Sequence, residues 1–340
     1  MSNPRVIKVG VIGAGRIGKI HAENLATRIP GVEVVAIADP NVAAAKELAE
    51  KLHVSAYYED YRKILDDKSI EAVLICSSTD THARFMTEAA EAGKHIFCEK
   101  PVDHSLEKID AALAAVKKAD VKCQIGFNRR FDPNFKKVRQ MVNEGKVGEV
   151  HILRITSRDP APPPVSYVKV SGGMFLDMTI HDFDMARYLS GSEVVEVFAA
   201  GGVMVDPGIG EAGDIDTAVI TLKFANGAIG TIDNSRKAVY GYDQRVEVFG
   251  SKGMVGVANN TANSSVYSSE DGVLSEKPLY FFLERYMDSF IAELSDFIDA
   301  VRDDKPTPVT ALDGRKPVVI AMAANKSLKE NRPVKLSEIE

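Results

Sequence analysis

The first third of the chain alternates short apolar runs with amphipathic segments. The apolar runs are rich in β-branched residues and occupy residues 7–13, 32–39, 71–78, 95–100 and 121–127. Between them lie segments with helical periodicity, at residues 17–29, 42–52, 81–93 and 105–119. Strands that alternate with helices are typical of βαβ units, and continuously apolar strands are typical of a parallel sheet covered on both faces. The pattern predicts a doubly wound α/β domain over residues 1–127.

The rest of the chain has a different pattern. Residues 216–236 contain two strand-like runs joined at Asn226-Gly227, a strong signal for a β-hairpin. Residues 246–257 repeat this arrangement around a second turn. Strands without intervening helices predict an α+β domain over residues 128–340, with a large open, mostly antiparallel sheet. We expect two helices to flank that sheet, one over residues 175–189 and one near Phe290–Val301.

Composition and charge exclude several classes of partner. Hydrophobic residues make up 45% of the 340 residues and charged residues 26%, as in an ordinary soluble globular protein. No apolar run is long enough to span a membrane, and the N-terminal stretch MSNPRVIKVG does not have the pattern of a signal peptide. The net charge is −6 and basic residues are not clustered, so nucleic acid is not an expected partner.

The cysteines indicate the compartment. Cys76, Cys98 and Cys123 each lie in or beside an apolar strand-like run, and none belongs to a Cys-x-x-Cys motif. An odd number of cysteines in such positions predicts buried, reduced thiols. We therefore expect a cytoplasmic protein.

The first strand–helix junction carries a glycine pattern. Gly13, Gly15 and Gly18 form G-x-G-x-x-G directly after an apolar run and at the start of a predicted helix. There, backbone amides and the helix N-terminus can meet a pyrophosphate without an intervening side chain. The turn made by Gly13, Gly15, Arg16, Ile17 and Gly18 is thus predicted to bind a dinucleotide, as in a Rossmann domain.

A second feature supports this interpretation and selects the cofactor. Asp39 ends the next apolar run, 21 residues after Gly18. An acid there accepts hydrogen bonds from both ribose hydroxyls and repels a 2′-phosphate, and no arginine follows it. These residues favour NAD over NADP. A tight turn followed by a surface aspartate is the alternative, and FAD is disfavoured because flavin enzymes usually need a larger chain to cover the isoalloxazine ring.

Polar residues also follow two later strands. Glu99 and Lys100 end one apolar run, and Asn128 and Arg130 follow the next. Ligands bind at the carboxyl ends of the strands in open α/β sheets. A half-desolvated lysine at this edge can donate to a substrate oxygen or stabilise a developing alkoxide, whereas a snorkelling surface lysine is the alternative.

The stretch FLDMTIHDFDMARYL, residues 175–189, combines helical periodicity with acids and an imidazole. Spacings of three and four place Asp177, His181, Asp184 and Tyr188 on one face of the predicted helix. Histidine suits the removal of a hydroxyl proton as hydride leaves the carbon, and Asp177 can orient the substrate or hold the ring. A solvated polar face is one alternative. A zinc site is another, but a third residue at ligand spacing is lacking, so no metal is predicted.

The motifs GAGRIGKIH, FCEKPV, NRRFD and DMTIHDFDMARYL together resemble the glucose–fructose oxidoreductase and inositol dehydrogenase family, with matching spacing along essentially the entire chain. Within that family, SRDPAPPP, VSGGMFLDMTIHDFDM and AVYGYDQRVEVFG are most similar to the bacterial inositol dehydrogenases. The resemblance implies that Lys100, Asp177 and His181 form the catalytic group, with His181 as the base. It also implies a homotetramer packed through the open sheet.

Further site residues follow from the same resemblance. It implies substrate contacts from Arg130, Asp159 and Tyr240. The cofactor contacts that we expect are Gly13, Gly15, Arg16, Ile17, Gly18, Asp39, Ser77, Glu99 and Asn128. The chain departs from the family at Ser77-Ser78-Thr79, where many members have Thr-Pro-Asn near the nicotinamide.

Together these features predict an NAD-dependent dehydrogenase acting on a cyclic polyol, chiefly myo-inositol or a stereoisomer, which is oxidised to the inosose. Lys100 would polarise the reacting oxygen while hydride passes to nicotinamide C4. Donors and acceptors on all sides suit a ring of hydroxyls, whereas a 2-hydroxy acid would call for a paired arginine clamp. The alternatives are an NAD(P)-dependent aldose or other sugar dehydrogenase of the same family, and a non-catalytic dinucleotide-sensing regulator.

Overall fold

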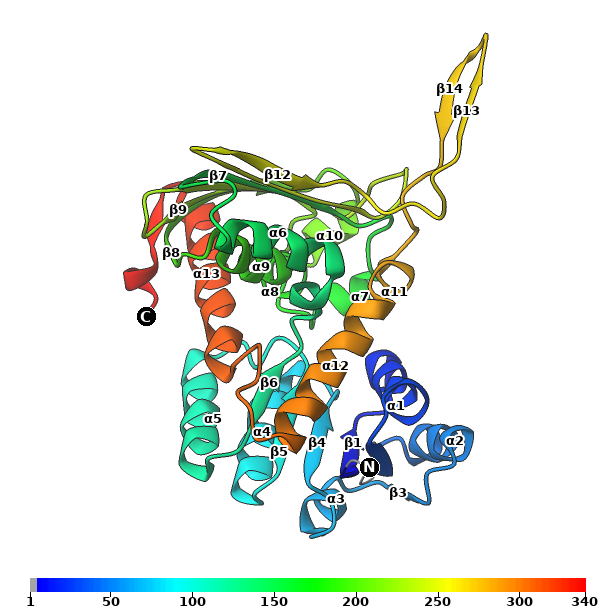
Figure 1. Cartoon of the computed structure of the whole chain (residues 1–340). Coiled ribbons are helices and arrows are strands. Elements are labelled where there is room, and N and C mark those ends of the chain that lie inside the picture. The colour runs from blue at the N-terminus through cyan, green and yellow to red at the C-terminus, as the bar shows by residue number, and fades with distance from the viewer. Residues whose placement is uncertain (1–4) are drawn as a thin grey trace. The chain divides into compact units, whose positions relative to one another are not determined.

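The computed structural model describes residues 5–340, which divide into two compact units (Figure 1). The first unit extends to Asn128 and also takes in Asp288–Lys316, while the second comprises Arg129–Met287 and Pro317–Glu340. The sequence predicts one continuous second domain over residues 128–340. In the structure, the segment Asp288–Lys316 instead clusters with the first unit.

The first unit contains a six-stranded sheet in the order β3-β2-β1-β4-β5-β6. All neighbouring strands pair in parallel, which confirms the predicted doubly wound sheet. Its strands are β1 (Ile7–Ile12), β2 (Val32–Ala38), β3 (Ala56–Tyr58), β4 (Ala72–Ile75), β5 (His95–Cys98) and β6 (Cys123–Ile125). The edge strand β3 is absent from the predicted runs, because it has only three residues, of which Tyr57 is exposed and the other two are partly buried.

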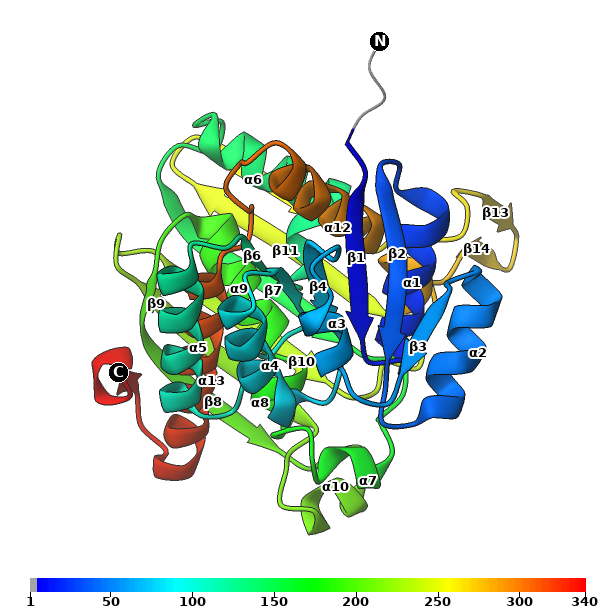
Figure 2. The ribbon, with the colours of Figure 1, turned by 90° about the horizontal axis from the view of Figure 1, so that it is seen from below.

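Helices alternate with these strands as predicted. They are α1 (Arg16–Arg28), α2 (Val42–Leu52), α3 (Arg62–Asp66), α4 (Thr79–Glu91) and α5 (Leu106–Ala119). Figure 2 shows β1, β2 and β3 side by side, with α1 and α2 next to them. Local chemistry sets two of the helix starts, since the Asn41 side chain accepts from Ala44 N and the Ser105 side chain from Lys108 N. The two helices that follow these caps end at left-handed residues, His53 and Asp120.

Helix α12 (Met287–Arg302) packs into the core of the first unit. The sequence predicts this helix but places it beside the open sheet, and that placement is wrong. Leu294, Phe297, Ile298 and Val301 join the same hydrophobic cluster as Val9 of β1. Helical periodicity shows that a segment has an apolar face, but it does not specify which of two sheets the face covers.

The second unit is built on a seven-stranded sheet in the order β12-β11-β7-β10-β9-β8-β15. Strands β7 and β10 pair in parallel and the other neighbours are antiparallel, as predicted for a mostly antiparallel sheet. The strands are β7 (Val150–Arg158), β8 (Val194–Gly202), β9 (Thr217–Phe224), β10 (Ile229–Ser235), β11 (Asp243–Gly250), β12 (Gly253–Val257) and β15 (Val334–Lys335). Both predicted hairpins are confirmed, and Gly227 supplies the positive φ that the first turn requires.

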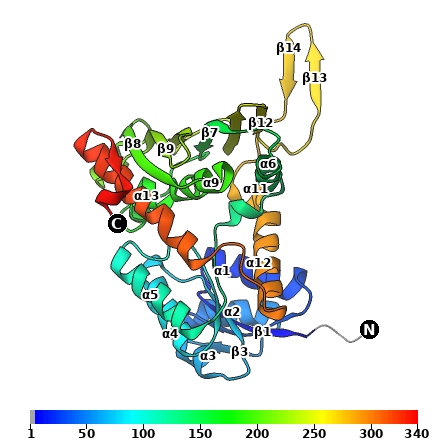
Figure 3. The same ribbon diagram turned by 60° about the vertical axis from the view of Figure 1, so that its left-hand side comes forward.

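Helices α6 (Pro133–Asn143) and α9 (Ile180–Ser190) lie along one face of this sheet, and α13 (Ala311–Glu330) ends on the same side of it (Figures 1 and 3). Exposed and buried residues alternate along β9, as expected where one face of a sheet is covered and the other is open. The smaller elements are α7 (Val165–Val168), α8 (Met174–Asp177), α10 (Pro207–Glu211), α11 (Phe282–Arg285), the 3₁₀ helices at Asn128–Phe131 and Leu336–Glu338, and the projecting hairpin of β13 (Val266–Ser269) and β14 (Gly272–Ser275).

The helix predicted over residues 175–189 is divided into α8 and α9. Thr179 lies in the turn between them, where its amide reaches back to Met174 O at 3.0 Å and its hydroxyl donates to Asn234 Oδ1 at 2.6 Å. Asp177 and His181 therefore belong to different helices, and the prediction of one continuous helical face is wrong. The hydrogen bond to β10 is a tertiary contact that the local pattern does not encode.

Two further expectations concern solubility and targeting. Within residues 5–340, the structure contains no helix that is both long and apolar enough to cross a membrane. Part of the N-terminal stretch that argues against a signal peptide, residues 1–4, lies outside the described residues. Cys76, Cys98 and Cys123 are free and buried, which confirms that part of the sequence prediction.

Candidate active site

The glycine turn after β1 is tightly packed at two of its three glycines. A Cβ atom on Gly18 would lie 2.0 Å from Gly13 O, and one on Gly13 would lie 2.5 Å from Cys76 O. Gly13 also has a φ of +107°, which other residues rarely adopt. At Gly15, by contrast, an added Cβ would meet no heavy atom of the described residues within 4 Å. Gly13 and Gly18 close the turn, and Gly15 leaves space for a ligand to approach the backbone.

Gly15 is the N-cap residue of α1, and among the described residues no side chain caps this helix. The amides of its first turn, which include Arg16, Ile17 and Gly18, are thus available to a ligand. An uncapped helix N-terminus carries partial positive charge and suits a pyrophosphate.

Asp39 is held beside this turn by two backbone amides. Its Oδ2 accepts from Ala14 N and its Oδ1 from Asn41 N, each at 2.7 Å. A carboxylate oxygen can accept more than one hydrogen bond, so both oxygens can also receive ribose hydroxyls. The two amides thus orient the predicted ribose-binding carboxylate, and each of its oxygens can still accept a further hydrogen bond.

The loops after β4 and β5 are joined by a histidine that the sequence analysis missed. The two ring nitrogens of His82 lie 3.0 Å from Ser77 O and 2.8 Å from Pro101 O. Burial lowers the pKa of His82 below its ordinary value, although the two carbonyls oppose this. Ser77 is further held by a hydroxyl–hydroxyl bond of 2.6 Å to Thr81. The only sequence signal was a histidine in the first turn of a helix that follows a strand.

The end of β5 carries Glu99, which is buried, and Lys100, which is half-buried. Glu99 Oε1 lies 2.6 Å from His21 Nε2, and Glu99 Oε2 accepts from the Lys100 amide at 3.3 Å. Because the sheet is parallel, the residues that follow β1, β2, β4, β5 and β6 meet at one edge. The structure therefore brings together these predicted residues: Gly13, Gly15, Arg16, Ile17, Gly18, Asp39, Ser77, Glu99, Lys100 and Asn128.

In the second unit, a single guanidinium joins two of the predicted acids. Arg236 Nη2 donates to Asp177 Oδ2 at 3.0 Å, and Nη1 lies 3.4 Å from Asp159 Oδ2. Tyr167 also donates to Asp177, at 2.8 Å. Arg236 is only 3% exposed, and the sequence analysis missed it because a lone arginine after a strand carries no motif.

Burial of Asp159 changes its acidity. Desolvation, reinforced by the nearby charge of Asp177, raises the pKa of Asp159 to about 6, while Arg236 opposes the shift. An aspartate perturbed in this way is a frequent property of functional sites. Asp159 and Asp177 are called the acid pair below, and Arg236 and Tyr167 are the side chains that contact it.

Tyr240 has other partners. Its hydroxyl donates to Asp243 Oδ2 at 2.6 Å and accepts from Arg158 Nη1 at 3.2 Å. Tyr240 and Arg158 help to line a cavity of about 410 Å³ that includes neither member of the acid pair. Within the described residues, Tyr240 is therefore grouped with Arg158 and Asp243 and not with Asp159.

The acids of α9 pair with arginines. Arg130 donates from Nε and Nη2 to the two oxygens of Asp184, at 2.8 and 2.6 Å, and Arg129 Nη1 lies 2.6 Å from Asp182 Oδ1. Both acids are almost fully buried. Arg130 thus holds α9 through a bidentate ion pair, a different contact from the substrate contact that the resemblance implies. His181, in the first turn of α9, is partly buried.

Comparison with known proteins identifies both halves of the chain. Residues 7–127 match the family described as "Oxidoreductase family, NAD-binding Rossmann fold", and residues 135–256 match the "GFO/IDH/MocA C-terminal domain". A myo-inositol 2-dehydrogenase of Thermotoga maritima is 53% identical, covering 98% of this chain and 99% of that protein.

Two further relatives are similar along their whole length. An inositol 2-dehydrogenase of Rhizobium meliloti is 43% identical over 97% of this chain and 99% of that protein. The crystal structure of scyllo-inositol dehydrogenase from Lactobacillus casei, with bound cofactor NAD(H) and scyllo-inositol, superposes with a TM-score of 0.91. It is 31% identical and covers 98% of this chain and all of that one.

The glycine turn generates a prediction that separates binding from folding. Gly15→Ala should leave thermal stability nearly unchanged, because an added methyl group meets no neighbour there, but it should weaken NAD binding by about tenfold or more by blocking backbone approach. Gly18→Ala, the matched control, should destabilise the fold through its clash with Gly13 O. Calorimetric NAD titration and thermal unfolding of both variants measure this. Unchanged NAD affinity in Gly15→Ala would contradict the assignment.

Proposed function

The chain belongs to the GFO/IDH/MocA oxidoreductase family, and we propose that it oxidises myo-inositol, or a stereoisomer, to the corresponding inosose with NAD as the hydride acceptor. The observation that carries the proposal is full-length similarity to a protein named myo-inositol 2-dehydrogenase. The glycine turn, the uncapped α1 and the anchored Asp39 fit a dinucleotide without a 2′-phosphate.

The residues around the cofactor have defined tasks. The amides of the Gly13–Gly18 turn would bind the pyrophosphate, and Asp39 would accept from the ribose hydroxyls. NAD, when bound, supplies the acceptor for the hydride. Ser77, Glu99 and Asn128, at the same sheet edge, would border the nicotinamide end.

The substrate chemistry would fall to Lys100, Asp177 and His181. A ring nitrogen of His181 takes the hydroxyl proton while the C–H bond releases hydride, so the alcohol becomes a ketone. Lys100 donates to the oxygen as its negative charge develops. Asp177, oriented by Arg236 and Tyr167, accepts a hydrogen bond from a hydroxyl of the substrate.

The electrostatics of the second unit support a neutral substrate. Arg129 and Arg130 donate to the buried carboxylates of Asp182 and Asp184, and Arg236 donates to the partly buried Asp177. A 2-hydroxy acid would require a guanidinium directed at its own carboxylate. Asp159 and Asp177 instead offer acceptor atoms, which suit the hydroxyls of a polyol.

The experiment that tests the function is a screen of inositol isomers, aldoses and hydroxy acids by NADH absorbance. We expect the highest kcat/KM with myo-inositol or a stereoisomer. His181→Ala should lower kcat by about 10²–10⁴-fold, the usual contribution of a positioned acid–base group. Lys100→Ala should be similarly impaired, whereas Lys68→Ala, at an exposed position between α3 and β4, should match the wild type.

Two outcomes would overturn the proposal. Negligible rates with every inositol and a robust rate with an aldose would assign the protein to the sugar dehydrogenases of the family. NAD binding without turnover of any substrate would indicate a dinucleotide sensor.

Cofactor preference should follow from Asp39. In this proposal the carboxylate would meet the 2′-phosphate of NADP, and like-charge juxtaposition costs several kcal/mol. We therefore expect kcat/KM with NAD to exceed that with NADP by about 10²-fold. Asp39→Asn removes the charge but keeps one oxygen that accepts a hydrogen bond from a backbone amide. It should lower the ratio of kcat/KM with NAD to kcat/KM with NADP. Steady-state kinetics with both cofactors provide the measurement, and an equal preference in the wild type would contradict the role of Asp39.

We also propose that the protein works as a homotetramer in the cytoplasm, where buried thiols stay reduced. An apolar row crosses the open face of the second sheet at successive cross-strand positions. It consists of the exposed Met254, Phe249 and Ile229 and the partly buried Ile152. Such a row suits a contact between copies of the chain. Light scattering should give four times the 36.9 kDa chain mass, and Phe249→Arg should reduce it. A monomeric wild type would refute the tetramer.

A further inference from the structure

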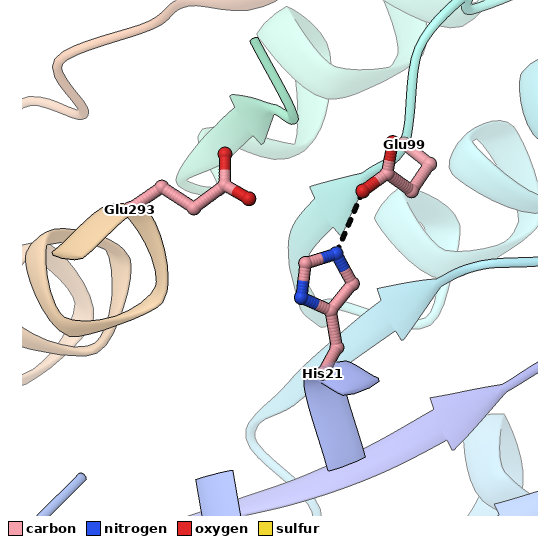
Figure 4. A group of neighbouring side chains, drawn as sticks. All are labelled: His21, Glu99 and Glu293. Atoms are coloured by element: carbon pink, nitrogen blue, oxygen red, sulfur yellow. Dashed lines mark hydrogen bonds and ion pairs between the residues drawn. The ribbon is translucent and has the colours of Figure 1, made fainter. Parts of the chain in front are cut away.

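Three ionisable side chains meet inside the first unit (Figure 4). They are His21 on α1, Glu99 at the end of β5 and Glu293 on α12, and their nitrogen and carboxylate oxygen atoms lie within 4.8 Å of one another. His21 and Glu293 are fully buried and Glu99 is 8% exposed. Burying a charge is costly unless it is paired, so this group requires a physical explanation.

The ring of His21 is held in a fixed orientation. Phe97 of β5 and Phe290 of α12 contact it edge-to-face, with ring centroids 5.2 and 5.6 Å away. This packing directs Nε2 at Glu99 Oε1, 2.6 Å away. Because His21 lies on the helix that begins in the glycine turn, its position is rigidly linked to that turn.

Glu99 transmits this orientation to the next residue. Its Oε1 contacts His21, while its Oε2 accepts from the Lys100 amide at 3.3 Å. The carboxylate packs closely against Gly126, where an added Cβ atom would lie only 3.1 Å from it, so this position suits a glycine. A continuous connection therefore runs from the cofactor-binding helix through His21 and Glu99 to the backbone of Lys100.

We propose that His21 and Glu99 are positioning residues that fix the Lys100 backbone to helix α1, so that Lys100 is placed for the reaction by the element that binds the cofactor. The proposal rests on the proposed function only in assigning Lys100 to the chemistry. Catalytic groups need placement to within about 0.5 Å, which a lysine on a flexible stem does not achieve unless its backbone is fixed.

Glu293 is the third member of this group, and its surroundings favour the neutral, protonated acid. Neither of its carboxylate oxygens has a hydrogen-bond partner among residues 5–340. Burial, together with the charge of Glu99, raises the pKa of Glu293 well above its usual range. A protonated Glu293 adds no negative charge beside Glu99 and His21. A divalent cation held by all three residues would instead require Glu293 to be ionised.

The first test compares two replacements of His21. His21→Ala should lower kcat about 10- to 100-fold, with kcat counted per active site that binds NADH, because a displacement of Lys100 by about 1 Å can cost that much. The KM for inositol and the Kd for NAD should change little. His21→Gln should recover most of the rate, because its amide nitrogen can donate to Glu99. A structural role alone would lower stability without this split between kcat and KM or this rescue. Full kcat in His21→Ala, or a folded His21→Gln as slow as His21→Ala, would overturn the proposal.

The second test concerns charge. Glu293→Gln copies the shape of the protonated acid, so thermal stability and kcat should match the wild type. Elemental analysis of the purified wild-type protein checks the competing interpretation. A stoichiometric divalent metal that disappears in Glu293→Gln would overturn the neutral state of Glu293 and replace the positioning pair by a metal site.

The third test does not depend on the substrate. Crystal structures of the wild type and His21→Ala with NAD should show the Lys100 backbone displaced by more than about 0.5 Å in the variant. If the wild type oxidised no inositol but the displacement were observed, the proposed function would fail while the positioning role stood. An unmoved Lys100 would refute the positioning role whatever the substrate.

Discussion

The second unit depends on pairing buried arginines with buried aspartates. Arg129 with Asp182 and Arg130 with Asp184 connect the segment after β6 to α9. Replacing one partner of such a pair by a neutral residue lowers the free energy of unfolding by about 3–5 kcal/mol, because the other charge stays buried without compensation. Since Asp182 follows His181 directly, the pairs fix the rotation of α9 about its axis and hence the direction of the histidine. Asp182 and Asp184, two of the acids that made this stretch of sequence look unusual, therefore hold the fold together.

The same constraint shapes the electrostatics around Asp177. Arg236 is shared by two acids. The acid pair and Arg236 together therefore carry one more negative than positive charge when both acids are ionised. An excess of negative charge repels anionic substrates and leaves lone pairs for hydroxyl hydrogens. Burial raises the pKa of Asp159 to about 6, so Asp159 gains its negative charge as the pH rises through that value. Pairing that stabilises the fold thus also favours a neutral polyol.

Local features were predictable from the sequence and distant contacts were not. Gly13, Gly18 and Asp39 follow from strand–turn–helix geometry, in which backbone sterics act over a few residues. The hairpin at Gly227 follows from turn chemistry in the same way. Three of the missed features are the role of Arg236, the break at Thr179 and the packing of α12. Each depends on a partner more than 50 residues away in the chain, such as Asp177 for Arg236 and Asn234 for Thr179. The resemblance to a family supplied Asp159 as a candidate, but it did not reveal the guanidinium that holds it.

The discontinuous first unit gives α12 two roles. Its apolar face closes the core cluster around Val9, and the same helix brings Glu293 to His21 and Glu99. The backbone oxygen of Glu293 also accepts from Gln124 of β6, at 2.7 Å. A Rossmann unit ending at Asn128 would leave Phe97 and the ring of His21 without their contacts to Phe297 and Phe290. The cofactor-binding sheet therefore becomes complete only when a segment that follows most of the second unit in sequence has packed against it. The apolar contacts that drive this packing also enclose the polar group beside Lys100.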